Sequence, residues 1–187
     1  MRLTDVSIQL SKWMAAATAA IAVAFATPLP VVAGGPTTSI QTEYLMTMHV
    51  LVAPLLPVDQ SLIIANLPSG GWVDGPQIKG KLVGPAGDWL RVMPSGVIRL
   101  DVRTAIQTDD GAAIFVSYNG VIQCSKEQGD RMNAGEELKA GDCHFINAPT
   151  FETKSEKYGW LNAVQAIGKM VSIKGGDHVD YDIFAVK

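Results

Sequence analysis

Short apolar runs alternate with glycine- and proline-rich turns from residue 43 to the end of the chain, and long helical periodicity is nearly absent. Runs of this kind are typical of β-strands, because successive side chains on a strand point to opposite faces. The turn signals include "PSGG", "PAGD", "PSG" and "DDG". The expected strands cover Glu43–Pro54, Ser61–Leu67, Gln77–Gly84, Trp89–Met93, Val97–Thr108, Ala112–Cys124, Val164–Ile173 and Val179–Val186.

This pattern predicts an all-β fold, a single antiparallel closed β-barrel of about eight or nine strands, with a sandwich as the alternative. A closed barrel leaves no exposed strand edge, and a barrel of this size has room inside for one small ligand. One or two short helices are expected, over Ser155–Val164, where Ser155 can act as the cap, and within "AGEELKAG" at residues 134–141.

The first 33 residues have the pattern of a secretory signal peptide. Arg2 and Lys12 flank a polar start, the apolar run Trp13–Ala26 follows, and the small residues at Val31–Ala33 suit a signal peptidase. We therefore expect export, to the periplasm or out of the cell, of a β-barrel domain at residues 34–187. An uncleaved anchor is the alternative, although the run is shorter than the roughly 20 apolar residues that a membrane span needs.

The two cysteines of the chain, Cys124 and Cys143, bracket one polar segment. In an oxidising compartment this arrangement predicts a disulfide, which the chain-entropy model values at roughly 3 kcal/mol. Two free thiols are the alternative. Neither cysteine belongs to a CxxC pair or to a Cys/His cluster, so a redox or metal role is not expected.

Charge and motifs narrow the classes of function. A formal net charge of −3 without a basic run argues against a nucleic-acid partner. The chain has no GxSxG, SxxK, P-loop or GxGxxG motif, which argues against the corresponding serine hydrolases and nucleotide-binding sites. His49, His144 and His178 show no HxH or HExxH spacing, so we expect no metal and no other cofactor.

The stretch "RLDVR", inside the strand expected at residues 97–108, carries three charges on one face. Arg99, Asp101 and Arg103 share that face, and Leu100 and Val102 share the other. In a polar cavity, an arginine could hold a carboxylate or enolate oxygen through two hydrogen bonds, and the aspartate could move a proton. The alternative is a solvated outer face with an ordinary cross-strand ion pair.

A second candidate region is "FETKSEKYGWLN" at residues 151–162. Phe151, Tyr158 and Trp160 supply flat apolar surface, and Glu152 and Asn162 supply polar groups. That mixture suits a ligand pocket with a few placed polar groups. The alternative is a lid in which the aromatic residues plug the barrel and Glu152 is exposed.

Three stretches, "GKLVGPAGDW" through "FVSYNG", "APTFETKSEKYGWLNAVQAIGK" and "VDYDIFAV", resemble the domain-of-unknown-function 3237 family. The shared order is a G-D-W turn, a D-x-R strand, a D-D-G turn, a Y-x-G strand, F-E-T and W-L-N, over about Glu43 to Val186. The resemblance implies a small antiparallel barrel, similar in shape to allene oxide cyclase barrels, with an interior pocket and an oligomeric assembly. It also favours an interior position for the Asp101/Arg103 face. The chain departs from the short family pattern in its signal peptide and in the segment between the cysteines, which could reshape the pocket mouth.

These observations lead us to expect an exported enzyme without a cofactor, a lyase, isomerase or cyclase that acts by acid–base chemistry on a small, oxygenated, partly apolar metabolite. Arg103 would bind a carboxylate or stabilise an oxyanion. Asp101 or Glu152 would move a proton, with Tyr118 as a further candidate acid. The expected ligand-binding residues are Trp89, Arg99, Phe151, Tyr158, Trp160 and Asn162.

Two other classes of function stay open. One is an exported barrel that binds a hydrophobic metabolite and performs no chemistry. The other is an assembly role for a barrel that its own side chains fill. In each case the expected partners are a small molecule or further copies of the chain, and no membrane once the signal peptide is removed.

Overall fold

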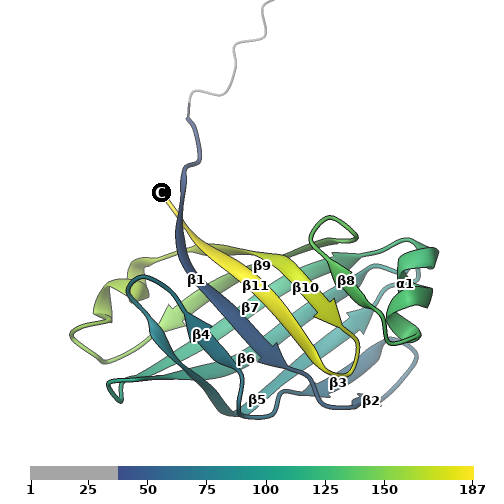
Figure 1. Cartoon of the computed structure of the whole chain (residues 1–187), viewed down its shortest axis with the longest axis horizontal. Coiled ribbons are helices and arrows are strands. Elements are labelled where there is room, and N and C mark those ends of the chain that lie inside the picture. The colour runs from purple at the N-terminus through teal and green to yellow at the C-terminus, as the bar shows by residue number, and fades with distance from the viewer. Residues whose placement is uncertain (1–37) are drawn as a thin grey trace, which may run out of the picture. The chain divides into compact units, whose positions relative to one another are not determined.

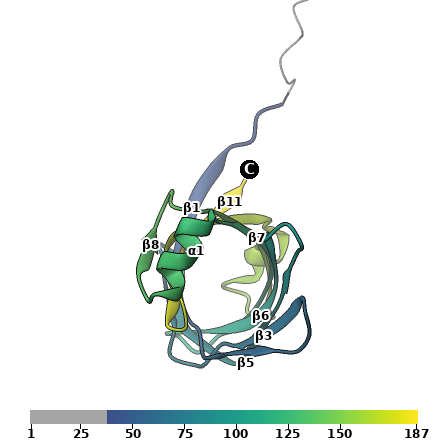
Figure 2. The ribbon, with the colours of Figure 1, turned by 90° about the vertical axis from the view of Figure 1, so that its right-hand side faces the viewer.

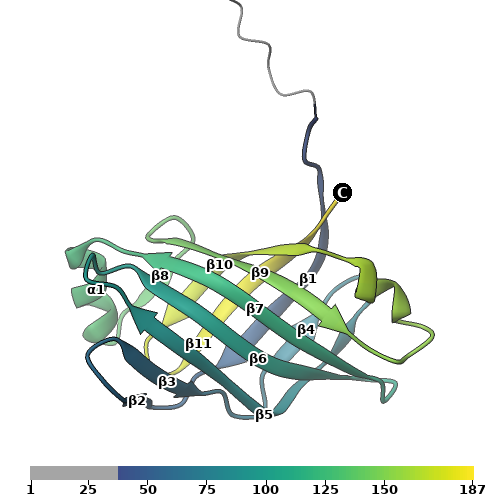
Figure 3. The same cartoon turned by 180° about the vertical axis from the view of Figure 1, so that it is seen from behind.

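The computed structural model describes residues 38–187, which form an antiparallel β-barrel with two short helical segments (Figures 1 and 3). The expected signal peptide lies outside the described residues. Within the described part, no helix has the length and apolar character needed to cross a membrane. The elements are β1 (Thr42–Leu51), β2 (Leu55–Pro57), β3 (Leu62–Asn66), β4 (Trp72–Asp74), β5 (Lys79–Val92), β6 (Ile98–Thr108), β7 (Ala113–Gln123), α1 (Lys126–Asn133), β8 (Glu137–Lys139), β9 (His144–Glu152), η1 (Gly159–Ala163), β10 (Ala166–Lys174) and β11 (His178–Val186).

Eight antiparallel strands close the barrel, which confirms the predicted fold class. Their order around the wall is β1, β11, β10, β9, β7, β6, β5 and β4. The long strand β5 allows closure because its first part pairs with β4, and β4 pairs in turn with β1. The second part of β5 pairs with β3, which pairs with β2. Seen along the barrel in Figure 2, the strands form a ring.

The strands expected from the sequence differ from the structure in two places, at β5 and at β9. The residues "PAGD" do not form a turn but lie inside β5, where the pairing with β6 shifts register between Val83 and Gly87. The strand β9, which was not expected, pairs with β7 along its whole length. As a result, β5 contains a register shift and β9 contains a proline, and both strands stay in the barrel wall.

The helices also differ from expectation. The stretch "AGEELKAG" contains β8, and the helix α1 comes just before it, starting after Ser125. The Ser125 side chain and the Gln128 side chain each accept a hydrogen bond from the other residue's backbone N–H, which forms a capping box. Over Ser155–Val164, only the 3-10 segment η1 is helical.

Apolar residues face the interior at every second position of the wall strands. On β6, for example, the buried positions alternate with positions that are at least partly exposed: Leu100, Val102, Thr104 and Ile106 are buried, and Asp101, Arg103 and Ala105 are not. The helical segments α1 and η1 lie at opposite ends of the barrel (Figure 1). Buried Phe151 and Leu161 belong to the core near η1.

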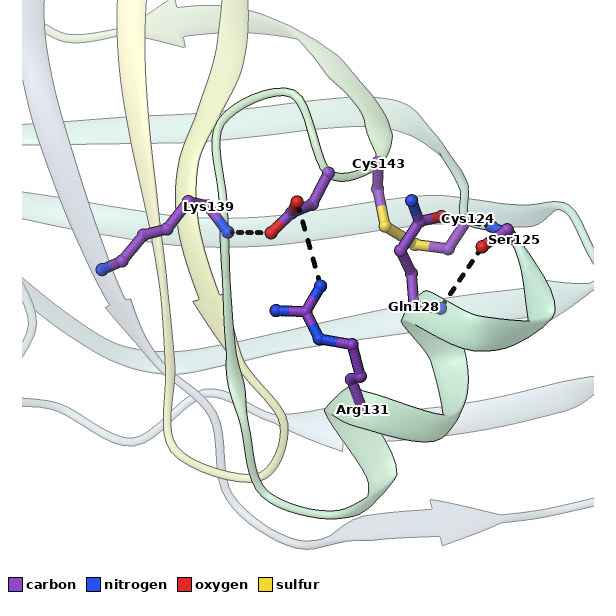
Figure 4. Close-up of a disulfide and its surroundings, with 7 residues drawn as sticks. Cys124, Ser125, Gln128, Arg131, Lys139 and Cys143 are labelled. Atoms are coloured by element: carbon purple, nitrogen blue, oxygen red, sulfur yellow. Dashed lines mark hydrogen bonds and ion pairs between the residues drawn. A yellow bond between two sulfur atoms is a disulfide. The ribbon is translucent and has the colours of Figure 1, made fainter.

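The disulfide predicted between Cys124 and Cys143 is confirmed (Figure 4). It joins the end of β7 to the start of β9 and therefore ties the intervening α1 and β8 to the barrel wall. Arg131 of α1 lies 4.0 Å from a carboxylate oxygen of Asp142, and this carboxylate accepts a hydrogen bond from the backbone N–H of Lys139 at 2.8 Å. A disulfide is consistent with the oxidising environment expected for an exported protein.

Candidate active site

The barrel interior contains a cavity of about 170 Å³. Its wall is mainly aliphatic and comes from six of the wall strands, from β2 and β3, from neighbouring loops and from Met132 of α1. Engineered apolar cavities of about 150 Å³ bind benzene, so the space fits a molecule of one ring. The polar and charged side chains that line it are Asp88, Tyr118, Tyr181, Lys174 and His178, of which Asp88, Tyr118 and Tyr181 are buried.

Asp88 points into this cavity because it shares the inward face of β5 with Leu90 and Val92. The residue is only 7% exposed. One oxygen of its carboxyl group, Oδ1, accepts a hydrogen bond from the backbone N–H of Asp101 at 3.0 Å. Among the described residues the carboxyl group has no other hydrogen bond and no cationic partner, so its remaining lone pairs are free for a ligand.

Burial dominates the electrostatics of the cavity. It raises the pKa of the Asp88 carboxyl from 3.8 to about 6, the Asp101 amide partly opposes that rise, and the Asp101 charge adds to it. Burial likewise raises the pKa of the Tyr118 and Tyr181 phenols, and the charge of Asp88 raises both further. Near neutral pH the tyrosines are therefore hydrogen-bond donors, and both protonation states of Asp88 are accessible.

The strand register brings these groups to one level of the barrel. Asp88 on β5 pairs with Val102 on β6, and Val102 pairs with Tyr118 on β7. Tyr181 reaches Tyr118 from β11, with 6.0 Å between the ring centroids and the rings edge to face. One carboxyl and two phenol groups thus line a single apolar space, an arrangement suited to proton transfer.

Asn147 on β9 is a fourth buried polar group, and only 1% of it is exposed. Neither its amide nitrogen nor its amide oxygen has a hydrogen-bond partner among the described residues. Asn147 lies close enough to the Tyr181 hydroxyl to lower the pKa of that phenol, which partly opposes the effect of burial. A buried amide without partners is costly, but Asn147 is not among the residues that line the cavity.

The structure places one predicted catalytic residue in the cavity and the other three on the outer wall of the barrel. Tyr118 is inside, as described above. The expectation that Asp101 and Arg103 face the interior was wrong, because Leu100 and Val102 occupy the inner face of β6. Asp101 and Arg103 form an ion pair of 2.9 Å on the outer wall, where their side chains are 46% and 52% exposed.

Arg99 and Trp89, predicted to bind ligand, also lie on the outer wall. Glu152 is exposed on the outer face of β9. Trp160 is exposed on η1. These side chains are exposed to solvent on the outside of the barrel, so none of them contributes to the interior cavity.

The other predicted ligand-binding residues have structural contacts. Phe151 is buried in the core but does not line the cavity. Buried Tyr158 donates its hydroxyl hydrogen to the carboxylate of Asp110. Asn162 exchanges two hydrogen bonds with the backbone of Thr153, at 2.8 and 3.0 Å, and so fastens η1 to the chain after β9.

Two of the histidines, His49 on β1 and His178 at the start of β11, come together, although their sequence spacing gave no sign of it. The rings of His49 and His178 have centroids 5.0 Å apart, and His49 Nδ1 lies 2.5 Å from a carboxylate oxygen of Asp180. Across residues 38–187, no group of three or more His, Cys, Asp or Glu side chains is arranged to hold a metal ion.

The protein is a closed barrel with a mainly apolar interior pocket and one buried carboxyl group that has no ion-pair partner among the described residues. The chain belongs to the family described as "Protein of unknown function (DUF3237)", whose model matches residues 40–186. This confirms the resemblance found in the sequence.

Three proteins from other organisms are similar in sequence to this chain. A UPF0311 protein of Rhodopseudomonas palustris is 28% identical over 155 residues, which cover 80% of this chain and 99% of that protein. A UPF0311 protein of Clostridium acetobutylicum is 37% identical over 91 residues, and the match spans 58% of its length. The hydroalkoxylation enzyme phnH of Penicillium herquei is 28% identical over 142 residues, 74% of this chain and 80% of that protein.

Solved structures agree on the fold. A conserved protein of unknown function from Rhodopseudomonas palustris superposes with a TM-score of 0.74 at 24% identity, over 81% of this chain and all of that one. At this level of identity the similarity supports the fold and nothing about function. An enzyme from Penicillium herquei superposes with a TM-score of 0.60 at 26% identity, over 82% of this chain and 99% of that one.

Proposed function

We propose that this protein is an exported acid–base enzyme, of the lyase, isomerase or cyclase type, whose reaction takes place in the barrel cavity. Asp88 is the proposed proton donor and acceptor, in place of the residues expected from the sequence. The observation that carries the proposal is a carboxyl group that is buried in a mainly apolar cavity, has no ion-pair partner among the described residues, and has its pKa raised to about 6. Carboxyl groups tuned in this way are suited to general acid–base catalysis near neutral pH.

The proposed reaction is the addition of an O–H group across a carbon–carbon double bond within one substrate. Protonated Asp88 donates its proton to one alkene carbon, and the substrate hydroxyl oxygen bonds to the neighbouring carbon. The proton of that hydroxyl returns to the Asp88 carboxylate, so the product is an isomer of the substrate and the enzyme is restored. Tyr118 and Tyr181, as neutral donors, orient the substrate oxygen.

Two observations support this type of reaction. The similarity to a hydroalkoxylation enzyme covers most of both chains, and hydroalkoxylation is the addition of O–H to a double bond. The aliphatic wall also suits the apolar, alkene-bearing part of such a substrate. With about 170 Å³ available, a one-ring substrate fits, and a larger one requires Met132 and α1 to move outward.

The test uses the mature protein and a panel of phenols that carry an ortho alkenyl group, incubated in D₂O. We expect cyclic ethers of unchanged composition apart from one deuterium on carbon. Asp88→Asn should abolish their formation, while Glu152→Gln, which removes an exposed carboxylate from the outer wall, should leave the rate unchanged.

The pKa of Asp88 provides a test that needs no substrate. Carbon-13 NMR of the Asp88 carboxyl should show a titration midpoint near 6. A midpoint at the ordinary value, or full activity of Asp88→Asn, would refute the acid–base proposal. Tight binding of the panel without turnover would instead favour the binding-protein alternative.

A further inference from the structure

The outer wall of β5 and β6 contains a second recess, of about 370 Å³, separated from the cavity by the barrel wall. Three of its four charged side chains are arginines. Because the whole chain carries a formal net charge of −3, this positive recess stands out against the rest of the molecule. The residues that line it are Leu62, Trp89, Arg91, Arg99, Leu100, Asp101 and Arg103.

Two of the arginines are placed against each other. Arg91 and Arg99 are direct cross-strand partners in the β5–β6 register, and like charges in that position destabilise a sheet. Among the described residues neither guanidinium has a carboxylate within ion-pair distance. Asp59 lies near Arg91, but its carboxylate accepts hydrogen bonds from the backbone N–H groups of Ser61 and Leu62.

The third arginine sets the aromatic side of the recess. Arg103 pairs with Asp101 and also lies over the ring of Trp89, with its guanidinium carbon 5.6 Å from the ring centroid. The cross-strand partner of Arg103 is Gly87, which has no side chain to hold the guanidinium away from the indole. After this pairing, the recess keeps two uncompensated positive charges beside an exposed indole.

We propose that this recess binds the phosphate or sulfate group of a small aromatic ester, with Arg91 and Arg99 as the oxyanion ligands and Trp89 as the neighbouring aromatic surface. Guanidinium groups match such oxyanions because each can donate two parallel hydrogen bonds. The bound anion would also relieve the repulsion between the two arginines. The proposal does not rest on the proposed function, since Arg91, Arg99 and Trp89 do not line the cavity.

The experiment is isothermal titration calorimetry at low salt with phenyl phosphate and, separately, inorganic phosphate. For the wild type we expect saturable one-to-one binding of phenyl phosphate with a Kd of about 1 mM or lower. The double variant Arg91→Gln/Arg99→Gln should weaken that binding about tenfold or more. Lys81→Gln, which removes an exposed cation from the same strand outside the recess, is the matched control and should bind as the wild type does.

A thermal melt separates loss of binding from loss of fold. The double variant replaces both repelling arginines, so its melting temperature should be unchanged or slightly higher than that of the wild type. Absence of saturable binding up to about 10 mM, or equal weakening in Lys81→Gln, would overturn the site. Equal affinity for inorganic phosphate and phenyl phosphate, unchanged by Trp89→Leu, would overturn the aromatic part of the proposal.

Discussion

Replacing Asp88 with Asn should stabilise the protein, and only above the pH at which the carboxyl group ionises. In the unfolded chain the carboxyl has a pKa of 3.8, and in the barrel burial raises it to about 6. Below about pH 3.8 the carboxyl group is protonated in both the folded and the unfolded state, so no charge is buried and its ionisation does not affect the free energy of unfolding. Between the two values the unfolded chain ionises first, so the free energy of unfolding falls as pH rises. Above about pH 6 the loss is constant.

The size of the effect follows from the same two values. A difference between 3.8 and about 6 corresponds to ~3 kcal/mol of unfolding free energy. Asn has nearly the same shape, keeps an oxygen to accept the Asp101 hydrogen bond, and does not ionise. We therefore expect the free energy of unfolding of Asp88→Asn to be higher than that of the wild type by up to about 3 kcal/mol at pH 8. This difference should disappear toward about pH 3.5.

Urea unfolding of both proteins across that pH range measures the difference directly, and other titrating groups cancel in the comparison. Glu152→Gln serves as the control, because this carboxyl group is exposed on the outer wall. If the difference in unfolding free energy between Asp88→Asn and the wild type does not change with pH, Asp88 is not a buried acid with a raised pKa. A larger excess at low pH would also contradict the reasoning.

Three further changes test the packing and the surface. Lys157 and neighbouring donors lower the pKa of Asp110 to about 2, so Asp110→Asn should destabilise the protein at pH 7, with the effect fading as pH falls from about 4 toward 2 in urea unfolding. Gly168→Ala would bring a methyl group to 2.0 Å from a buried amide oxygen, and should cost about 1–3 kcal/mol or more by the same assay. Replacing Cys124 and Cys143 with Ser should cost roughly 3 kcal/mol, measured by thermal melting against the wild type, and an unchanged melting temperature would contradict the role given to the disulfide.

Side-chain alternation was sufficient to predict the barrel, but not to place every charge. On β6 the pattern offers one apolar face and one charged face, and burial of Leu100 and Val102 outweighs any benefit from enclosing Asp101 and Arg103. The interior placement of the charged pair followed the family resemblance instead of the hydrophobic pattern. The resemblance was correct about the fold, but it carried no information about which face of the strand was inside.

The central residue of the site was missed because of a turn signal. "PAGD" has turn composition, so Asp88 was assigned to a loop, although it is in phase with Leu90 and Val92. A charged residue in phase with an apolar strand face is the signal that could have found it. In β9, similarly, Asn147 lies in phase with Phe145, but a proline two residues on disguised the strand.

The barrel wall is one peptide thick between Asp88 and Asp101. The amide of Asp101 holds the carboxyl group inside, while its side chain stands in solvent among the arginines outside. Surface substitutions near Asp101 therefore act on the proton affinity of the interior group without changing the shape of the cavity. In evolutionary terms, substitutions at surface positions that would otherwise be counted as neutral can shift the pH range in which Asp88 is protonated.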